Sequence, residues 1–432
     1  MMAVVKPFRG YFYTQEIVRE RGIGKLVAPP YDVISEKEKQ NLMQEEYNFV
    51  HIILGKTEEG YRTAAEKLSN WVKNGILTQD TEKCFYVYEQ EFRLTGFHRG
   101  KTRVRTGFVA LVRLEEFEKK IILPHEKTMP KYSMDRLELM EATRANLEQI
   151  FGIYHDPKGV VDGVLEEAKI PENKLFEFTD SWGVVHRVFK LADPEKIERI
   201  QRVMNPRTII IADGHHRYET CLNYRRKIRE KLGDPLEEIP EDYTMMTLVS
   251  IQNPGLLILP THRLVKNLPK ENVAGFFERC EQYFTVQIFP DERAMEEYLR
   301  NAPSYTIGVY DKEEEKWGAI TLKDPKIMDA RLGVENVNRY LETAILHELV
   351  FKDLLGLGED AQGKSEHVDY LRGTKDVFAI AREENQYQLV FVMRSTPMEM
   401  VEKAVTARQR MPQKSTYFYP KVWSGLVLRF LE

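Results

Sequence analysis

The sequence predicts a mixed α/β protein built from more than one domain. Its 432 residues are more than one small core needs, so two or three domains are expected. Strand-like and helix-like segments alternate along the chain, without an internal repeat. Hydrophobic residues make up 42% of the chain and aromatic residues 11%, enough for ordinary packed cores. We predict an N-terminal α/β domain at 1–155, a central domain at 156–268 and a C-terminal α/β domain at 269–432.

The predicted N-terminal domain begins with helices and continues into strands. Ser35 is expected to cap one helix, and apolar residues at helical spacing predict another over 61–75. Two strand-like runs, 85–94 and 102–114, flank the turn-forming sequence TGFHRGK, which indicates a hairpin. A polar loop, an amphipathic helix and a short strand are expected within 122–154.

The predicted central domain alternates strands and helices. A strand at 184–192 leads into a helix at 193–204, whose Asp-Pro start suits a capped helix N-terminus. An apolar strand at 208–213 then passes through a polar junction into a helix at 217–233. Two further strands are predicted at 243–251 and 255–265.

The predicted C-terminal domain mixes the same elements. Leucine, isoleucine and valine at helical spacing predict a helix over 336–358. A strand is expected at 387–394, followed by a helix at 396–410 whose Thr396 suits a capping box. The remaining tail is rich in proline and aromatic residues.

Composition narrows the classes of function. With 63 basic and 67 acidic residues the formal net charge is −4, which gives no reason to expect nucleic acid or an anionic membrane as partner. The cationic helix face NYRRKIREK is most simply a solvated surface. Three scattered cysteines without a CxxC pair favour a reducing compartment, and no apolar run approaches the ~18 residues of a membrane span. We therefore expect a cytoplasmic protein that acts on small molecules; the sequence does not fix its oligomeric state.

The segment ADGHHRYET places polar groups where the strand 208–213 passes into a helix. The first N–H groups of a helix lack intrahelical partners and, with the helix dipole, attract anions. Glycine lets the backbone approach a bound group, arginine can fork onto phosphate oxygens, and histidine can donate to phosphate or move a proton. We therefore predict a phosphate site formed by Gly214, His215, His216 and Arg217. The carboxylate of Asp213 is placed to hold Mg²⁺ or to accept a hydroxyl proton.

The same residues allow two other interpretations. Asp213 and Gly214 could form a plain turn, with His216 as a cap and Arg217 as a surface ion-pair partner. A zinc site is also open, but neighbouring histidines point apart, whereas zinc ligands on a helix prefer i, i+4 spacing. Phosphate is therefore favoured over zinc.

Two further loops carry groups suited to phosphoryl transfer. The segment LPHEKT offers a base, a carboxylate and a cation, so we predict His125 and Glu126 as catalytic residues and Lys127 as a phosphate-binding residue. The tail segment MPQKSTYFYPK lacks the upstream glycines of a P-loop but offers cations and hydroxyls to a second phosphate. The residues predicted there are Lys414, Ser415, Thr416 and Lys421. A solvated charged loop is the alternative for LPHEKT.

A zwitterionic acceptor also needs a partner for its carboxylate. Arg144 in ATRAN and His262 in PTHR are the predicted substrate-binding residues. Arg144 could instead form a structural ion pair, and His262 ends a strand that we expect in the same sheet as Asp213. Asp32 in APPYD follows two prolines, which favours a structural turn.

The central region resembles a known nucleotide-binding fold. The order strand, helix, strand, DGHHRYE, helix over about 185–265 resembles the ParB/sulfiredoxin-like fold, and its Asp-Gly-His-His-Arg turn resembles that of free L-serine kinases in that superfamily. Over nearly its whole length the chain is identified as a member of the prokaryotic domain-of-unknown-function family 1015 (DUF1015), on the segments KPFRGYFY, VAPPYDVIS, ILPHEKT, ATRANLEQIFGIY, ADGHHRYET, ILPTHRLV and MPQKSTYFYPK. The resemblance implies a serine kinase, with pyrophosphate-using members in the family.

We therefore expect a small-molecule kinase. The donor phosphate would lie at the Gly214–Arg217 turn, Mg²⁺ would be held partly by Asp213, and Glu126 would take the proton of the acceptor hydroxyl. The resemblance implies free L-serine as acceptor and O-phospho-L-serine as product, with ATP, ADP or pyrophosphate as donor. Two alternatives are a nucleotide-binding switch module without turnover and a metal-dependent phosphohydrolase or nuclease.

Overall fold

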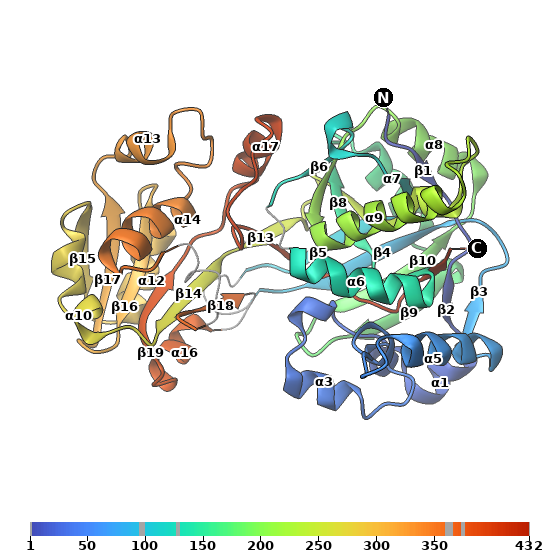
Figure 1. Ribbon diagram of the computed structural model, residues 1–432, viewed down its shortest axis with the longest axis horizontal. Helices are drawn as coiled ribbons and strands as arrows, with labels where there is room; N and C mark the ends of the chain where they lie inside the picture. The colour runs from blue at the N-terminus through green and yellow to red at the C-terminus, as the bar shows by residue number, and fades with distance from the viewer. Residues whose placement is uncertain (1, 95–99, 127–129, 359–365, 373–375, 432) are drawn as a thin grey trace.

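The computed structural model describes residues 2–94, 100–126, 130–358, 366–372 and 376–431. The chain forms two lobes, each built around one larger β-sheet with helices packed against it (Figure 1). The predicted mixed α/β class is confirmed. No helix in the described ranges is long and apolar enough to cross a membrane.

The larger lobe is organised by a sheet in which, over the described residues, nine strands pair. Their order is β6-β11-β8-β12-β5-β4-β10-β9, and β1 pairs with β5. The strands are β1 (Val5–Lys6), β4 (Phe85–Phe92), β5 (Arg103–Arg113), β6 (Ile122–Pro124), β8 (Ile150–Tyr154), β9 (Lys174–Thr179), β10 (Val185–Leu191), β11 (Ile209–Asp213) and β12 (Tyr243–Ser250). The predicted hairpin is present as the antiparallel pair β4–β5. Strands from the predicted first and second domains both contribute to this sheet, and β6, β8 and β5 of the first lie beside β11 and β12 of the second.

The apolar run before the DGHHR turn forms the buried strand β11. Ile209 and Ile211 face one hydrophobic cluster, and Ile210 and Ala212 face the other, because side chains alternate along a strand. The first cluster lies under α7 (Val160–Ala168), α8 (Pro194–Met204) and α9 (His215–Lys231). Burial on both faces explains why three consecutive β-branched isoleucines, 209–211, begin this strand.

The N-terminal helices and the C-terminal tail cover the other face of the large sheet. The remaining elements of the larger lobe are β2 (Tyr11–Tyr13), α1 (Gln15–Arg21), α2 (Ile23–Leu26), η1 (Tyr31–Val33), α3 (Glu36–Leu42), α4 (Val50–Ile53), α5 (Arg62–Lys73), β3 (Leu77–Gln79), η3 (Phe117–Lys119), α6 (Pro130–Thr143), β7 (Ala145–Asn146), η4 (Pro171–Asn173) and η5 (Pro240–Asp242). Ser35 caps α3 by accepting from the Glu38 N–H, as predicted. Figure 1 shows α6 beside α9, and the two helices pack together.

The smaller lobe contains a sheet of order β15-β17-β16-β19-β14-β18, six strands within the described residues. Its elements are β14 (Thr261–Lys266), α10 (Lys270–Val273), α11 (Phe276–Cys280), β15 (Phe284–Phe289), α12 (Glu292–Asn301), β16 (Thr306–Asp311), β17 (Lys316–Leu322), α13 (Ile327–Leu332), α14 (Glu342–Ile345), the π-helix η6 (Leu346–Leu354), β18 (Val368–Arg372), α16 (Val377–Glu383), β19 (Tyr387–Val392) and α17 (Met398–Thr406). The short strand β13 (Leu257–Leu259) precedes them, pairs outside this sheet and packs through Leu259 against residues of the larger lobe.

Three predicted features of this lobe differ from the structure. The strand that carries His262 is β14, so it lies in the smaller sheet and not in the sheet of Asp213. The predicted helix 336–358 is confined to 342–354, because the side-chain Oδ1 of Asn336 accepts a hydrogen bond from the Asn338 N–H and the segment forms a turn instead. The helix predicted from 396 begins at Met398 without a side-chain cap, so Thr396 forms no capping box.

The chain returns to the larger lobe at its end. Strand β20 (Tyr417–Tyr419) pairs with β13, and β21 (Arg429–Phe430) pairs with β7. Trp423 and Leu428 of this tail are buried in the core of the larger lobe. The tail is therefore part of the body that carries the ADGHHRYET segment.

Candidate functional site

The site forms where two neighbouring strands end. β6 and β11 are parallel, with Ile211 opposite Pro124, so the loops that follow them leave the sheet side by side. One loop brings Glu126, and the other brings Asp213. The C-terminal tail joins them, since the Met411 N–H donates to the His125 carbonyl. Segments far apart in the sequence therefore meet at one sheet edge, a common position for ligand sites in α/β proteins.

These loops enclose a cavity of about 90 Å³. Predicted site residues form most of its wall: Glu126, Asp213, Gly214, His215, His216, Arg217, Lys414, Thr416 and Lys421. Tyr31, Asp32, Ala212, Arg372 and Tyr417 complete it. We call this space the anion cavity, because four cationic side chains and the start of a long helix face it.

The start of helix α9 has the form predicted for a phosphate cradle. Gly214 precedes the helix with φ +86°, in the left-handed region that glycine adopts without strain, and no side chain caps the helix. A Cβ at Gly214 would lie 2.9 Å from Nε of Arg217, because the guanidinium packs directly over the glycine. The first turn therefore presents its N–H groups and positive dipole end to the cavity.

Asp213 is the counter-ion of this cluster. Its Oδ2 lies 3.3 Å from Nζ of Lys421 and 3.4 Å from Nη2 of Arg217. Burial alone would raise the pKa of Asp213, but Lys421 and Arg217 hold that pKa well below its ordinary value. Arg217 also donates to the carbonyl of Gln149. Asp213 is therefore ionised at neutral pH and holds two cations at the cavity wall.

Glu126 faces the same cavity in a different electrostatic environment. Its Oε1 accepts a hydrogen bond from the backbone N–H of Lys414 at 3.1 Å. Burial raises the pKa of Glu126, although the nearby Lys414 charge acts in the opposite direction. Burial also lowers the pKa of Lys414. A carboxylate with a raised pKa beside a cationic cavity is suited to accept a proton.

His125 lies behind the wall with both ring nitrogens engaged. Nδ1 donates to the carbonyl of Ile211 at 2.6 Å, so Nε2 accepts from the Thr416 hydroxyl at 2.7 Å. Burial lowers the pKa of His125 to about 4. Its backbone N–H donates to Nε2 of His215, whose pKa burial also lowers. His125 thus ties both strand ends to the tail, an arrangement that favours positioning over the catalytic role predicted from the sequence.

Besides His125, three described residues that were predicted for the site, Ser415, Arg144 and His262, do not contribute to the wall. Ser415 is buried and donates to the Pro412 carbonyl. Arg144 is exposed just beyond α6 with φ +48°, and His262 is buried in the smaller sheet, where Nδ1 accepts from the Met393 N–H. Lys127 lies outside the described residues.

The sequence does not predict Arg372 as a site residue, and it favours a structural role for Asp32. In the structure, η1 places the Asp32 side chain in the wall of the cavity. Arg372 ends β18, an edge strand of the other lobe, so no local pattern links it to the DGHHR turn. The rigid APPYD turn was the one signal available for Asp32.

No group of three or more His, Cys, Asp or Glu side chains that could hold a metal ion occurs among the described residues. Asp213, the predicted metal ligand, nevertheless lines the anion cavity. Mg²⁺ is often held by one or two carboxylates together with substrate phosphates, so this carboxylate fits a magnesium ion that binds with a polyphosphate.

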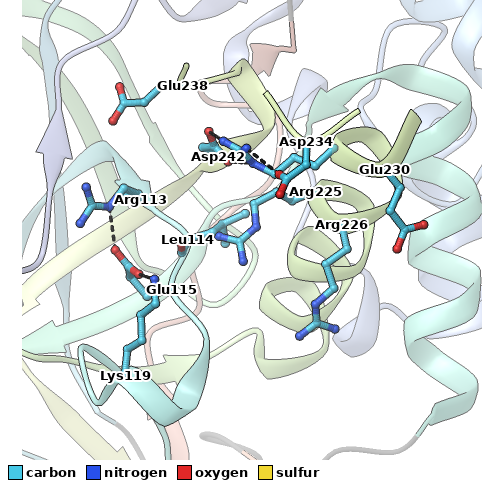
Figure 2. Close-up of a pocket in the computed structure, with 11 residues that line it drawn as sticks. Arg113, Leu114, Glu115, Lys119, Arg225, Arg226, Glu230, Asp234, Glu238 and Asp242 are labelled. Carbon is cyan, nitrogen blue, oxygen red and sulfur yellow. Dashed lines mark hydrogen bonds and ion pairs between the residues drawn. The ribbon is translucent and has the colours of Figure 1, made fainter. Parts of the chain in front are cut away.

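A larger cavity, of about 620 Å³, lies beside the cationic face of α9 (Figure 2). Its cations are already paired: Arg113 and Lys119 with Glu115, Arg225 and Arg226 with Glu116, and Arg229 with Asp242. This pairing agrees with the interpretation of NYRRKIREK as a solvated face. The anion cavity is therefore the stronger candidate despite its smaller size.

Comparison with known families supports the resemblance read from the sequence. A family described as protein of unknown function (DUF1015) matches residues 5–345. The chain belongs to this family. The matched range contains Glu126 and the DGHHR turn and ends before Arg372, Lys414 and Lys421. No curated protein matches the chain.

Several solved structures are similar to the DUF1015 chain. A free serine kinase in complex with AMP is 14% identical, with a TM-score of 0.31, covering 69% of this chain and 83% of that one. SbnI with a C-terminal truncation from Staphylococcus aureus is 11% identical, with a TM-score of 0.34, covering 73% and 84%. A conserved hypothetical protein from Pyrococcus furiosus is 15% identical, with a TM-score of 0.32, covering 69% and 87%.

Proposed function

We propose that this protein is a magnesium-dependent kinase that transfers a phosphoryl group from ATP, ADP or pyrophosphate to the hydroxyl of free L-serine. The observation that carries the proposal is the anion cavity, where an uncapped helix start and four cations lie beside a carboxylate with a raised pKa. Phosphoryl transfer requires mainly positioning and neutralisation of charge, which this set supplies.

The donor phosphates would bind at the start of α9. The N–H groups of its first turn donate to a phosphate, and Lys421 and Lys414 neutralise its charge. Asp213 pairs with Lys421 and Arg217, and an incoming phosphate would compete with it for these two cations. A bound Mg²⁺ would neutralise further charge on the donor, with Asp213 as its protein ligand.

Glu126 would serve as the base. The serine Oγ forms the new P–O bond while the bond between the transferred phosphorus and its bridging oxygen breaks, and the Oγ proton passes to the Glu126 carboxylate. The shortened donor leaves with the electron pair of the broken bond, and the cations around it stabilise that charge. The raised pKa of Glu126 improves its match to the proton that it takes.

Phosphorus NMR tests this proposal. Purified protein is incubated with Mg²⁺, serine and, in turn, ATP, ADP and pyrophosphate. We expect a phosphomonoester signal that matches O-phospho-L-serine with at least one donor. Donor hydrolysis that proceeds equally without serine would establish a phosphohydrolase instead, and donor binding without any turnover would establish a binding module.

We also propose that the protein works in the cytoplasm on small molecules and not on nucleic acid. The thiols of Cys84, Cys221 and Cys280 are free and buried, which agrees with a reducing compartment. Labelling of unfolded protein from cell extract should find all three as thiols.

A further inference from the structure

A second cavity, of about 330 Å³, adjoins the anion cavity. The two share Asp32, Arg372 and Tyr417 in their walls. The second one, which we call the acceptor cavity, is otherwise lined mainly by aromatic and apolar side chains, including Trp182 and Tyr370. One acidic, one basic and one aromatic residue therefore stand where the two spaces meet.

The two spaces differ in size. The anion cavity measures about 90 Å³. The acceptor cavity has several times that room and opens onto the same charged side chains.

Arg372 and Asp32 form an open pair. Their Nη1 and Oδ2 atoms are 4.0 Å apart, the limit for an ion pair, and among the described residues no closer ion pair involves either side chain. The side chains keep 23% and 36% of their surface exposed. An arginine fork and a carboxylate held this far apart can each take an opposite charge from a ligand.

We propose that Arg372 and Asp32 bind the carboxylate and the ammonium group of a free α-amino acid, whose hydroxyl then points from the acceptor cavity toward Glu126. The inference rests on the proposed function and names the acceptor-binding residues of that same site. Arg372 lies close enough to Glu126 for its charge to act on that carboxylate, so an acceptor held by Arg372 is near the base. This pair replaces Arg144 and His262, which lie outside both cavity walls.

The test pairs protein variants with substrate analogues. Serinamide lacks the carboxylate charge of serine, and 3-hydroxypropanoate lacks the ammonium group. In wild-type protein we expect both analogues to be at least tenfold poorer than serine in kcat/KM. Arg372→Gln should raise KM for serine at least tenfold with a smaller effect on kcat, and should accept serine and serinamide about equally. Asp32→Asn should lose the preference for serine over 3-hydroxypropanoate in the same way.

We call the proposed binding of the amino acid by Arg372 and Asp32 the clamp. Control variants distinguish its loss from a loss of folding and from a failure of the proposed function. Arg382→Gln, which removes a paired arginine of the same lobe outside both cavities, should behave as wild type. Arg372→Lys keeps the charge but loses the fork, and should recover part of the affinity. If Arg372→Gln raises KM for a nucleotide donor and leaves the serine-to-serinamide ratio unchanged, the acceptor cavity holds a nucleoside and the clamp is wrong.

If no phosphorylation occurs, calorimetry still shows whether Arg372 and Asp32 bind serine. Serine binding to wild-type protein that is lost in Arg372→Gln would support the clamp while the kinase proposal fails. Absence of serine binding to the folded wild-type protein, with and without pyrophosphate and Mg²⁺, would overturn the clamp.

Discussion

Glu126 makes the site sensitive to pH. If it is the base, Glu126→Gln should lower turnover by about 10²–10⁴-fold while donor affinity stays within a few fold, because the side chain is not a phosphate ligand. In the wild type the rate should fall as pH drops through the raised pKa of Glu126. Rates and donor affinities across pH for both proteins measure this. A variant that keeps its rate would remove Glu126 from the mechanism.

Glu126 should also make the stability of the protein depend on pH, in a direction that its raised pKa sets. Its folded-state pKa is above its unfolded value, so its contribution to stability is present below the unfolded pKa and is lost as pH rises through the folded pKa. Glutamine resembles the protonated form and suffers no such loss. The unfolding free energy of Glu126→Gln should therefore match wild type near pH 4 and exceed it at pH 7, by about 1.4 kcal/mol for each tenfold rise in proton affinity. Urea titrations at the two pH values test this, and equal stability at both would contradict the burial argument.

Asp213 should affect metal-bound and metal-free donors in opposite directions. Asp213→Asn removes an anion that competes with phosphate for Lys421 and Arg217, so metal-free pyrophosphate should bind at least as tightly as to wild type. With Mg²⁺, the lost carboxylate should reduce the gain in affinity that the metal gives and should lower turnover more than binding. Calorimetry with pyrophosphate, with and without Mg²⁺, shows both effects. Parallel losses under the two conditions would argue against a metal role.

At the scale of single elements, the turn before α9 offers a matched comparison. Gly214 and Gly159 both precede a helix with positive φ, but a Cβ at Gly159 meets nothing within 4 Å, whereas one at Gly214 meets Arg217. Gly159→Ala should cost about 1 kcal/mol of stability from backbone strain alone. Gly214→Ala should cost more and should also weaken pyrophosphate binding. Thermal unfolding of the two variants with and without pyrophosphate distinguishes these effects. If pyrophosphate raises the Tm of both variants equally, the turn at Gly214 does not contribute to binding.

The sequence predicted those elements that depend on contacts between residues close together in the chain. Alternation and capping located the β4–β5 hairpin, the start of α3 and the junction from β11 to α9, because each depends on local contacts. Asn336 ended a predicted helix through one side-chain hydrogen bond, which periodicity does not report. The contribution of Arg372 depends on how two sheets pack, a non-local property for which a single sequence holds no pattern.

At the scale of the molecule, the site joins both lobes. Asp32 and Asp213 belong to the larger lobe and Arg372 to the smaller one, so a ligand that contacts all three should restrain their relative motion. We expect donor and serine together to slow hydrogen exchange in both 31–33 and 368–372, segments more than 300 residues apart. Mass-spectrometric exchange measures this. Protection confined to the DGHHR turn would show that the ligand leaves the smaller lobe untouched.

The returning tail also bears on biosynthesis. Lys414 and Lys421 reach the cavity only when β20 has paired with β13 and the tail has packed onto the larger lobe. The large sheet is complete at residue 250, so it can begin to fold while the rest of the chain is still being translated. At about 5–20 residues per second, its strands wait at least several seconds for those lysines. A nascent chain would therefore carry a formed sheet but no working anion cavity, and a message cut short before codon 421 would yield an inactive protein.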